Sequence, residues 1–479
     1  MLRIIVYASF FWLTISNSNA NQVITLEDVV RSVLNSNLEI DKQQTLVDGS
    51  NAAAQQVSSE FDWNLAAEGG LRRPRVPKAN SEGLLTNETE FNYVSKVSVG
   101  MEKRFRNGIT FAPGGSYSQN LNSNRSDVLA DSVSAPSLAV TIPLLRGRGT
   151  KATTANEQAA KQTQKASELN KDRTTAKIIV NATHQYWQSV AAKRNLEAEQ
   201  KAGEEAADIT ENLKKLSEQG ELSILEYQSS VANLNLRRLK IEKSAATWNS
   251  TRRKLARIME SGHRIKNLPV SDNQFPNFGE EEHLILDENV LIDIAFEQRR
   301  DLLALQRKLQ SKKLNLVKFR NDMQPQLDLN LDLDKITLSY AQSLGRNLSK
   351  GRKRASSAEL KAQEIELQML KQAISDEVYE TVDNLQLSFK SYKRAHKAYR
   401  LLDQIANTTR DKVVQGTAAR NEYLSALDKL SEVEQIINAA SVDYATALAK
   451  LRLATGTLPI GSTKIQDTLK TLLTVPTNG

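Results

Sequence analysis

The sequence contains no cysteine and only four histidines. Without cysteine, a disulfide scaffold, a thiol nucleophile and a diacylated lipoprotein anchor are all excluded. The histidines (His184, His263, His283 and His396) are scattered, and none stand four residues apart as zinc ligands on one helix face would. The chain also has no Gly-x-Ser-x-Gly turn and no glycine-rich phosphate loop in its usual context. We therefore predict no enzyme activity, no cofactor and no bound metal.

Long hydrophobic runs are also missing, because no stretch of eighteen apolar residues occurs anywhere in the chain. Residues 1–20 combine Arg3, a mostly apolar run from Ile4 to Ile15, and the small residues Ser18 and Ala20, which is typical of a secretory signal peptide. That run is too short to span ~30 Å of hydrocarbon as a helix, which argues against a membrane anchor. If the mature chain crosses a membrane, it must do so as a β-barrel, since only helices and closed barrels satisfy the backbone in lipid.

The charge balance gives little evidence for a nucleic-acid partner. Lys and Arg number 64 against 56 Asp and Glu, a net charge of +8, and the two signs are interspersed along the chain. Hydrophobic residues make up 40% of the chain, a little under the usual share for a globular protein. Long helices with solvated faces account for both observations. We expect no binding to nucleic acid.

An internal repeat organises the sequence. Gln219-Gly220 and Gln415-Gly416 lie 196 positions apart, and the same offset continues without a gap. It relates the following pairs: Glu226 and Glu422, Tyr227 and Tyr423, Ser229 and Ser425, Leu234 and Leu430, Ile241 and Ile437, Trp248 and Tyr444, Leu255 and Leu451. The chain is therefore interpreted as a duplication. Its expected parts are a signal peptide at 1–20, a first repeat at 21–262, a linker at 263–285, a second repeat at 286–460 and a C-terminal tail at 461–479.

Each repeat is predicted to contain a very long helix. Residues 150–218 are free of proline, and 353–414 are similar in length and composition. At 1.5 Å per residue the first would extend about 100 Å, so it needs neighbours along its whole length. Shorter helices expected at 26–60 and 289–322, and after each Gly-containing turn, can supply those neighbours. The heptad spacing predicts coiled-coil packing, which a soluble coiled coil would explain equally well.

Between the helices the apolar period changes to two, which predicts strands. The segment Gln326–Tyr340 alternates apolar and polar residues and changes phase at Asp334-Lys335, where we expect a two-residue turn that sets Leu333 opposite Ile336. In a barrel, the apolar side of this hairpin would face lipid. The predicted lipid-facing residues are Leu327, Leu329, Leu331, Leu333, Ile336, Leu338 and Tyr340.

The first repeat contains four further strand candidates. They lie near 63–71, 93–102, 109–118 and 138–142, with an Asn107-Gly108 turn before the third and a polar loop at 119–135. One chain has too few strands to close a barrel around water, so closure requires several copies.

This order of elements resembles the TolC-like outer-membrane efflux family over essentially the whole mature chain. Four segments carry the resemblance. Asn35–Leu38 (NSNL) and Ala295–Leu302 (AFEQRRDL) resemble the segments that open the first and second repeats in the family. Pro143–Gly149 (PLLRGRG) resembles the family's junction between strand and long helix, and residues 414–427 resemble its helical tip. Each motif is weak alone, and their common order is what favours the family.

The resemblance implies a fold, an assembly and a location. The fold is mixed α and β: about four strands per protomer form a twelve-stranded barrel in a homotrimer, continued by a long periplasmic helical barrel. Such a channel is a passive exit duct in the cell outer membrane, in contact with its lipid, that works with a periplasmic adaptor protein and an inner-membrane pump for efflux or type I secretion. An exported structural coiled-coil protein without a pore is the alternative. The resemblance implies two strands in the first repeat, whereas the sequence offers four candidates there. The additional hairpin near 92–119 is therefore either part of the barrel or an extracellular flap.

The resemblance also assigns roles to residues at the helical tips. The periplasmic entrance of the family matches Glu422, which keeps an acidic charge, and Ser425, which does not. The gate-locking arginine of the family matches Ala418, so a different gate is expected. The predicted adaptor contacts are Gln219, Gly220, Glu226, Tyr227, Gln415, Gly416 and Tyr423.

Overall fold

The computed structural model describes residues 23–79, 85–91, 93–120, 132–259, 268–272, 275, 286–415, 417, 419–460 and 465–476. The predicted signal peptide, most of the predicted linker, the centre of the 119–135 loop, Gly416 and Ala418 lie outside these residues. The chain forms two compact units. We call Met1–Leu38, Thr175–Leu291 and Val378–Gly479 the helical unit, and Glu39–Thr174 and Ile292–Glu377 the sheet unit. Each unit therefore takes segments from both predicted repeats.

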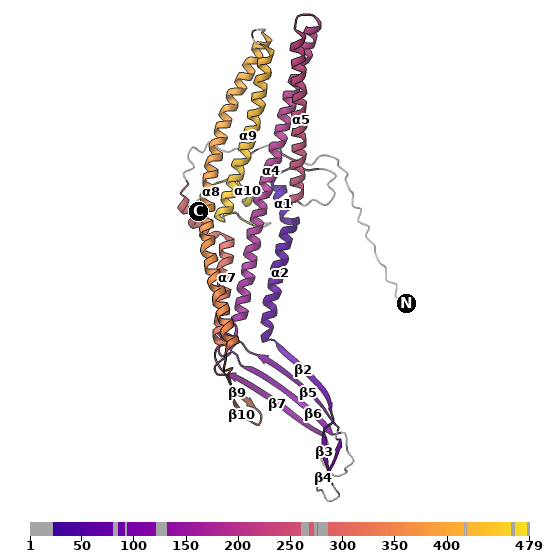
Figure 1. Ribbon diagram of the computed structural model, residues 1–479, viewed down its shortest axis with the longest axis vertical. Helices are drawn as coiled ribbons and strands as arrows, with labels where there is room; N and C mark the ends of the chain where they lie inside the picture. The colour runs from indigo at the N-terminus through magenta and orange to yellow at the C-terminus, as the bar shows by residue number, and fades with distance from the viewer. Residues whose placement is uncertain are drawn as a thin grey trace, which may run out of the picture. The chain divides into compact units, whose positions relative to one another are not determined.

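Helices dominate the described chain (Figure 1). The α-helices are α1 (Leu26–Ser36), α2 (Leu38–Ser58), α3 (Thr150–Thr153), α4 (Ala155–Glu218), α5 (Ile224–Met259), α6 (Glu288–Gln298), α7 (Arg300–Asn321), α8 (Asn347–Val414), α9 (Arg420–Thr455) and α10 (Ile465–Leu472). The long helices α4 and α8 hold 64 and 68 residues, as the absence of proline predicted. The helices expected at 26–60 and 289–322 are each divided in two, at Asn37 and Arg299. None of the described helices is both long and apolar enough to cross a membrane.

The strands form one large sheet and two small ones. They are β1 (Val23–Ile24), β2 (Trp63–Arg72), β3 (Arg75–Ala79), β4 (Leu85–Phe91), β5 (Val94–Arg104), β6 (Thr110–Asn120), β7 (Ser132–Pro143), β8 (Val270–Ser271), β9 (Gln326–Asp332) and β10 (Ile336–Ala341). The large sheet has the order β10-β9-β7-β6-β5-β2, and every neighbouring pair in it is antiparallel. The hairpin β3–β4 lies beyond the far ends of β2 and β5 (Figure 1).

The strand count differs from the number that the resemblance implied. The large sheet has six described strands rather than about four, because the β5–β6 hairpin is inserted between β2 and β7. The predicted turn Asn107-Gly108 makes this hairpin: Gly108 has a φ of +98°, and the Asn107 Oδ1 accepts a hydrogen bond from the Ile109 N–H at 3.0 Å. The 92–119 hairpin therefore belongs to the sheet and is not a separate flap.

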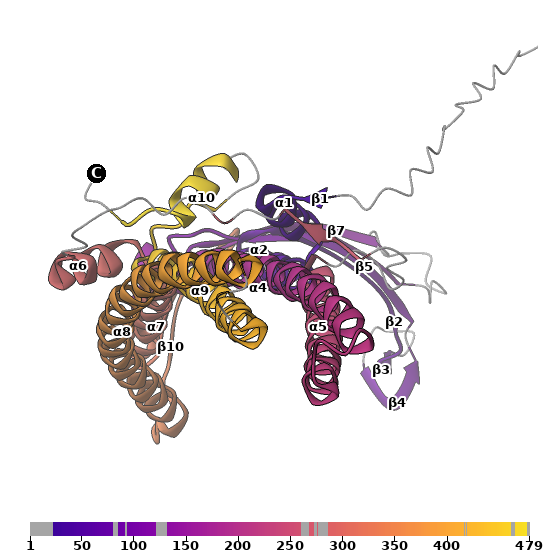
Figure 2. The same cartoon turned by 90° about the horizontal axis from the view of Figure 1, so that it is seen from above.

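In the helical unit α8, α9, α4 and α5 lie side by side (Figures 1 and 2). Small and aromatic residues make the contacts: Gly203 on α4 faces Ile241 on α5, and Phe389 on α8 packs 5.3 Å from Tyr444 on α9. Gly456 ends α9 with a φ of +73°. The Arg452 guanidinium then donates to the carbonyls of Thr471, Thr474 and Val475, which holds the tail beyond α10 against α9.

The internal repeat recurs in the helix boundaries. Helix α4 ends at Glu218 and α8 at Val414, while α5 spans Ile224–Met259 and α9 spans Arg420–Thr455. All three boundaries differ by the 196 positions seen in the sequence. The offset seen in the sequence therefore also separates the ends of corresponding helices.

Candidate functional site

The large sheet has two chemically different faces. Residues that pair across neighbouring antiparallel strands point to the same face of the sheet. One such row of paired residues runs across all six strands and consists of Trp63, Lys103, Phe111, Val140, Leu331 and Ile336. Alternate rows belong to opposite faces. The apolar face carries Leu65, Leu71, Val97, Val99, Met101, Tyr117, Leu138, Ile142 and Leu338, besides the row just named.

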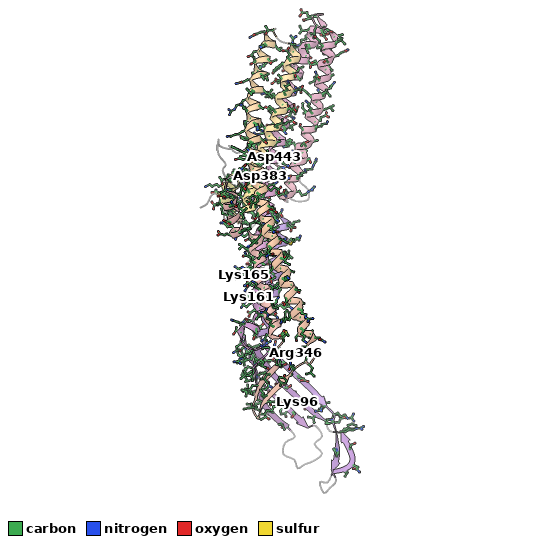
Figure 3. All side chains as sticks on the ribbon, turned by 60° about the vertical axis from the view of Figure 1, so that its left-hand side comes forward. Lys96, Lys161, Lys165, Arg346, Asp383 and Asp443 are labelled. Atoms are coloured by element: carbon green, nitrogen blue, oxygen red, sulfur yellow. The ribbon has the colours of Figure 1, made fainter. Side chains whose placement is uncertain are left out.

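The opposite face is polar and lined by small residues. It carries Asn64, Glu68, Lys96, Ser98, Glu102, Ser116, Ser118, Ser137, Thr141, Asp328, Asn330, Thr337 and Ser339. Lys96 lies in β5, in the strand layer (Figure 3). Thr141 on β7 and Asn330 on β9 join side chains across this face at 3.0 Å, and Asn330 also donates to Ser339. Glycine and alanine residues between these groups leave a hollow next to Gly100 and Gly114.

The apolar face is uncovered in the single chain. Leu65 is 70% exposed, Val97 52% and Ile336 76%. Exposed apolar surface on this scale marks contact with a membrane or a protein partner. Rings lie on the face where the strands approach the helices: Trp63 meets Phe111 edge-on at 6.3 Å, and the Lys103 ammonium lies 5.3 Å from the Trp63 ring.

Six of the seven residues predicted to face lipid lie on the apolar face, all but Leu333, and their register differs from the prediction. Ile336 pairs with Leu331 rather than Leu333, Leu338 with Leu329, and Tyr340 with Leu327. The predicted two-residue turn is therefore wrong: Leu333 belongs to the loop that the Asp332 N–H closes on the Lys335 carbonyl at 2.9 Å. Because the pairing shifts by two residues, the six residues within the strands stay on the face where they were expected.

Glycines make the junction between strand β7 and the long helix. Gly147 and Gly149 have φ angles of +84° and +85°, which side-chain-bearing residues rarely adopt. The Gly147 N–H donates to Asn321 Oδ1 at 2.8 Å, and the Gly149 N–H donates to the Asn107 carbonyl at 3.1 Å. The PLLRGRG segment singled out in the sequence thus joins the β5–β6 turn, helix α7 and helix α4.

A buried carboxylate with two exposed cationic partners reinforces this junction. Both Arg106 nitrogens, Nε and Nη2, donate to the Glu157 carboxylate at 3.0 Å, and Lys161 donates to it from one helical turn further at 2.9 Å. Figure 3 shows Lys161 and Lys165 one turn apart on α4. The Glu157 side chain is only 3% exposed, and the hydrogen bonds from Arg106 lower its pKa from 4.5 to about 2. Arg106 also covers the Phe61 ring, 4.9 Å from its centre.

A cluster of two buried arginines and two partly exposed carboxylates holds α4, α7 and α8 together in the sheet unit. Arg299 donates two bonds to Asp301, at 3.1 and 2.8 Å, and one to Glu377 at 2.6 Å. Arg173 reaches the same two carboxylates at 3.4 and 3.6 Å. Two cations and two anions thus neutralise each other, although burial and the neighbouring Arg299 lower the pKa of Arg173. The Arg-Asp-Leu segment of the resemblance therefore has a structural role here.

The two helical tips share one hydrogen bond of the helix end among the described residues. At the first, the Glu221 N–H donates to the Leu216 carbonyl and the Gly220 N–H to the Ser217 carbonyl, with Gly220 at a φ of +77°. At the second, the Thr417 N–H donates to the Lys412 carbonyl at 2.9 Å. These are the bonds of a glycine-dependent helix end. Gln219, Gly220, Glu226 and Gln415 are exposed there, and Tyr227 is half-buried.

Near the second tip, neighbouring residues face opposite ways. Glu422 and Ser425 are exposed and lie about one turn apart on α9. Tyr423 is buried against α4, where its hydroxyl donates to Glu205 Oε2 at 2.5 Å, and burial together with that carboxylate raises the pKa of Tyr423. Tyr423 is therefore part of the helix packing and is not an exposed tip residue.

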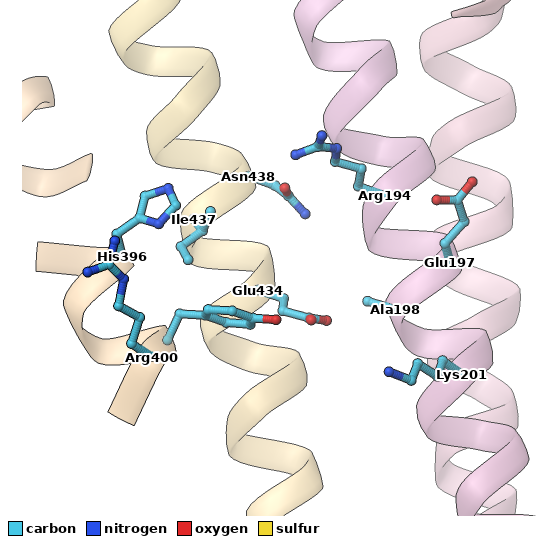
Figure 4. Close-up of a pocket in the computed structure, with 10 residues that line it drawn as sticks. Arg194, Glu197, Ala198, Lys201, His396, Arg400, Glu434, Ile437 and Asn438 are labelled. Carbon is cyan, nitrogen blue, oxygen red and sulfur yellow. The ribbon is translucent and has the colours of Figure 1, made fainter. Parts of the chain in front are cut away.

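A charged pocket of about 550 Å³ lies between α4, α8 and α9, and the sequence patterns gave no signal for it. Arg194 and Lys201 reach it from α4, Glu434 from α9, and His396 and Arg400 from α8 (Figure 4). Burial raises the pKa of Glu434 and lowers that of His396. Residues far apart in sequence form the pocket, so only the helix packing reveals it.

The fold is that of outer-membrane channels. The Campylobacter jejuni CmeC outer membrane channel aligns with a TM-score of 0.67 and 15% identity over 93% of this chain and 89% of that chain. The Vibrio cholerae outer membrane protein VceC aligns with a TM-score of 0.63 and 12% identity over 90% of this chain and 96% of that chain. The open state of the Neisseria gonorrhoeae MtrE outer membrane channel aligns with a TM-score of 0.63 and 14% identity over 90% of this chain and 88% of that chain. No protein-family model and no curated protein matches the sequence. The predicted resemblance is thus confirmed at the level of the fold.

Proposed function

We propose that this protein is a passive exit duct of the cell outer membrane. The observation that supports it best is the two-faced sheet, whose exposed apolar side suits lipid and whose polar side suits a water-filled lumen. The shared fold with outer-membrane channels agrees with this location. The predicted signal peptide at 1–20 would direct the chain out of the cytoplasm.

The duct is proposed to be a homotrimer. Among the described strands, the large sheet has a free edge at β2, which runs antiparallel to both β10 and β7 because the six strands alternate in direction. A second copy can therefore continue the ladder. Apolar residues are exposed on both outer helices of the helical unit: Leu236 and Leu239 on α5, and Leu387, Leu401 and Ile405 on α8. Packing α5 of one copy on α8 of the next would cover both sets.

The energy for transport is proposed to come from an inner-membrane pump, joined to the duct by a periplasmic adaptor. The adaptor would contact the exposed residues of the two capped tips, including Gln219, Gly220 and Gln415. The exposed Glu422 would lie at the periplasmic entrance, where three copies form an acidic ring and Ser425 adds no charge. Such a ring favours cations.

The proposal is tested on the purified protein and on membrane fractions. We expect it in the outer membrane, as a trimer that detergent preserves and heating dissociates, and we expect discrete conductance steps in a planar bilayer. A well-folded monomer that produces no conductance would instead support the exported coiled-coil protein. The tip contact is checked by cysteines at Gln219 or Gln415, which should crosslink to the adaptor, with a cysteine at the exposed Thr89 on β4 as the control.

A further inference from the structure

The strands of the large sheet differ sharply in length between the repeats. In the first repeat, β2, β5, β6 and β7 hold 10, 11, 11 and 12 residues. In the second repeat, β9 and β10 hold only 7 and 6. A tilted strand needs about 9 to 11 residues to cross a membrane. The first four strands meet this requirement and the last two do not.

The short hairpin also lies at one end of the sheet only. Strand β9 pairs with β7 from Ala139 to Pro143, the five residues closest to helix α3. Beyond Asp332 the hairpin turns back, whereas β7 continues through Ser132–Leu138, where β6 is its only partner among the described strands. That stretch of β7 has a free edge in the single chain. Figure 1 shows β9 and β10 at the helix end of the strands, away from the β3–β4 hairpin.

We propose that the membrane is crossed only by β2, β5, β6 and β7, all from the first repeat, and that β9–β10 is a collar at the periplasmic rim. This rests on the proposed outer-membrane duct. In a trimer, the free edge of β7 at Ser132–Leu138 pairs with β2 of the next copy. The two strands are antiparallel in the sheet order, so the ladder closes without a break in direction.

The side chains agree with this assignment. On β2 and β5 the apolar face extends along most of the strand, from Trp63 to Leu71 on β2 and from Met101 to Val97 on β5, and β6 adds Phe111 and Tyr117 to it. Ten residues at about 3.4 Å each, tilted by about 40°, span roughly 25 Å, the usual height of the apolar band. Four crossing strands in each of three copies give twelve. The insertion of β5–β6 thus replaces the crossing strands that the shortened β9–β10 hairpin cannot supply.

The native chain has no cysteine, so single cysteines report accessibility directly. We would place one at Asp334, the exposed turn of the collar, and one at Thr89 on the far hairpin β4, in otherwise native protein. Intact cells are treated with a polyethylene-glycol maleimide too large to enter the pore. Reactivity of both variants is checked in detergent extracts, with Lys335→Cys replacing Asp334→Cys if the latter is not produced.

The expected result is labelling of Thr89→Cys and no labelling of Asp334→Cys until the outer membrane is opened. Labelling of both on intact cells would show that β9–β10 reaches the surface, which overturns the collar but leaves the duct in place. Labelling of neither until the membrane is opened would overturn the duct itself. As a second measurement, Ser134→Cys on β7 should form trimer ladders on oxidation with cysteines scanned through Ala67 to Leu71 on β2. If ladders arose only between β2 and β10, the proposed pairing would be wrong.

Discussion

Replacing Glu157 by Gln should loosen the junction between the sheet and helix α4. Glu157 is 3% exposed and accepts hydrogen bonds from Arg106 and Lys161, and these lower its pKa from 4.5 to about 2. Counted in full, that difference corresponds to about 3 kcal/mol of stability. Because Arg106 is 55% exposed, solvent screens the pair, and we expect about 1 to 2 kcal/mol.

The stabilisation by Glu157 should depend on pH. A carboxylate with a lowered pKa stabilises the folded state fully above its unfolded pKa, near 4.5, and this contribution is lost as the pH falls towards 2. The native protein should therefore lose stability between pH 4.5 and 2 by about 1 to 2 kcal/mol more than Glu157→Gln does. The glutamine variant is already weaker at neutral pH, and the two should converge in acid.

The measurement is the unfolding midpoint of the detergent-solubilised protein, recorded from pH 7 down to pH 2. Glu168→Gln is the matched control, because Glu168 lies on the same helix but is exposed. The prediction would be contradicted if Glu157→Gln lowered the unfolding midpoint no more than Glu168→Gln does, or if the pH profile did not change. Either result would show that the ion pair contributes no stability and that the glycine turns alone hold the junction.

Three further predictions concern charged side chains. Asp301→Asn should lower stability by about 3 to 5 kcal/mol in chemical unfolding, because Arg299 then stays buried with one carboxylate fewer; a loss under 1 kcal/mol would contradict this. Glu434→Gln should raise the unfolding temperature at pH 8 and not at pH 4, because burial raises the pKa of Glu434 and makes its charged form costly. An equal effect at both pH values would refute this prediction. In bilayer recordings, Glu422→Gln should reduce both the preference of the channel for cations and its block by divalent ions. Glu226→Gln serves as the comparison, and unchanged selectivity of Glu422→Gln would place Glu422 outside the lumen.

Local patterns in the sequence predicted most of the backbone. Long proline-free stretches predicted α4 and α8, and alternation predicted β2, β5, β6, β7, β9 and β10, because both signals depend on neighbouring residues. The β3–β4 hairpin was missed, since its strands Arg75–Ala79 and Leu85–Phe91 show no apolar alternation. The pairing of Ile336 with Leu331 was also missed: several loop lengths satisfy the same alternation, and only the backbone selects one.

The contacts between distant segments were beyond the reach of the sequence. The motif at Arg299–Leu302 was recognised only as a family resemblance, and its partner Glu377 lies 78 residues away. Likewise, the bond from Tyr423 to Glu205 withdraws a predicted tip residue from the surface. Such pairs depend on which helices become neighbours, and a single sequence does not record that.

The equivalent helices α5 and α9 give a final test of the trimer. Leu236 and Leu239 on α5 are 58% and 52% exposed, and the 196-residue offset puts Glu432 and Gln435 at these positions of α9. The same helix therefore forms with polar residues there, so the two leucines are not needed for folding, and a neighbouring copy is the partner that would cover them. Leu236→Glu combined with Leu239→Gln should keep the unfolding midpoint of the monomer while trimers dissociate in cross-linking and sedimentation. A trimer as stable as the native one would show that this apolar edge faces something other than α8 of the next copy.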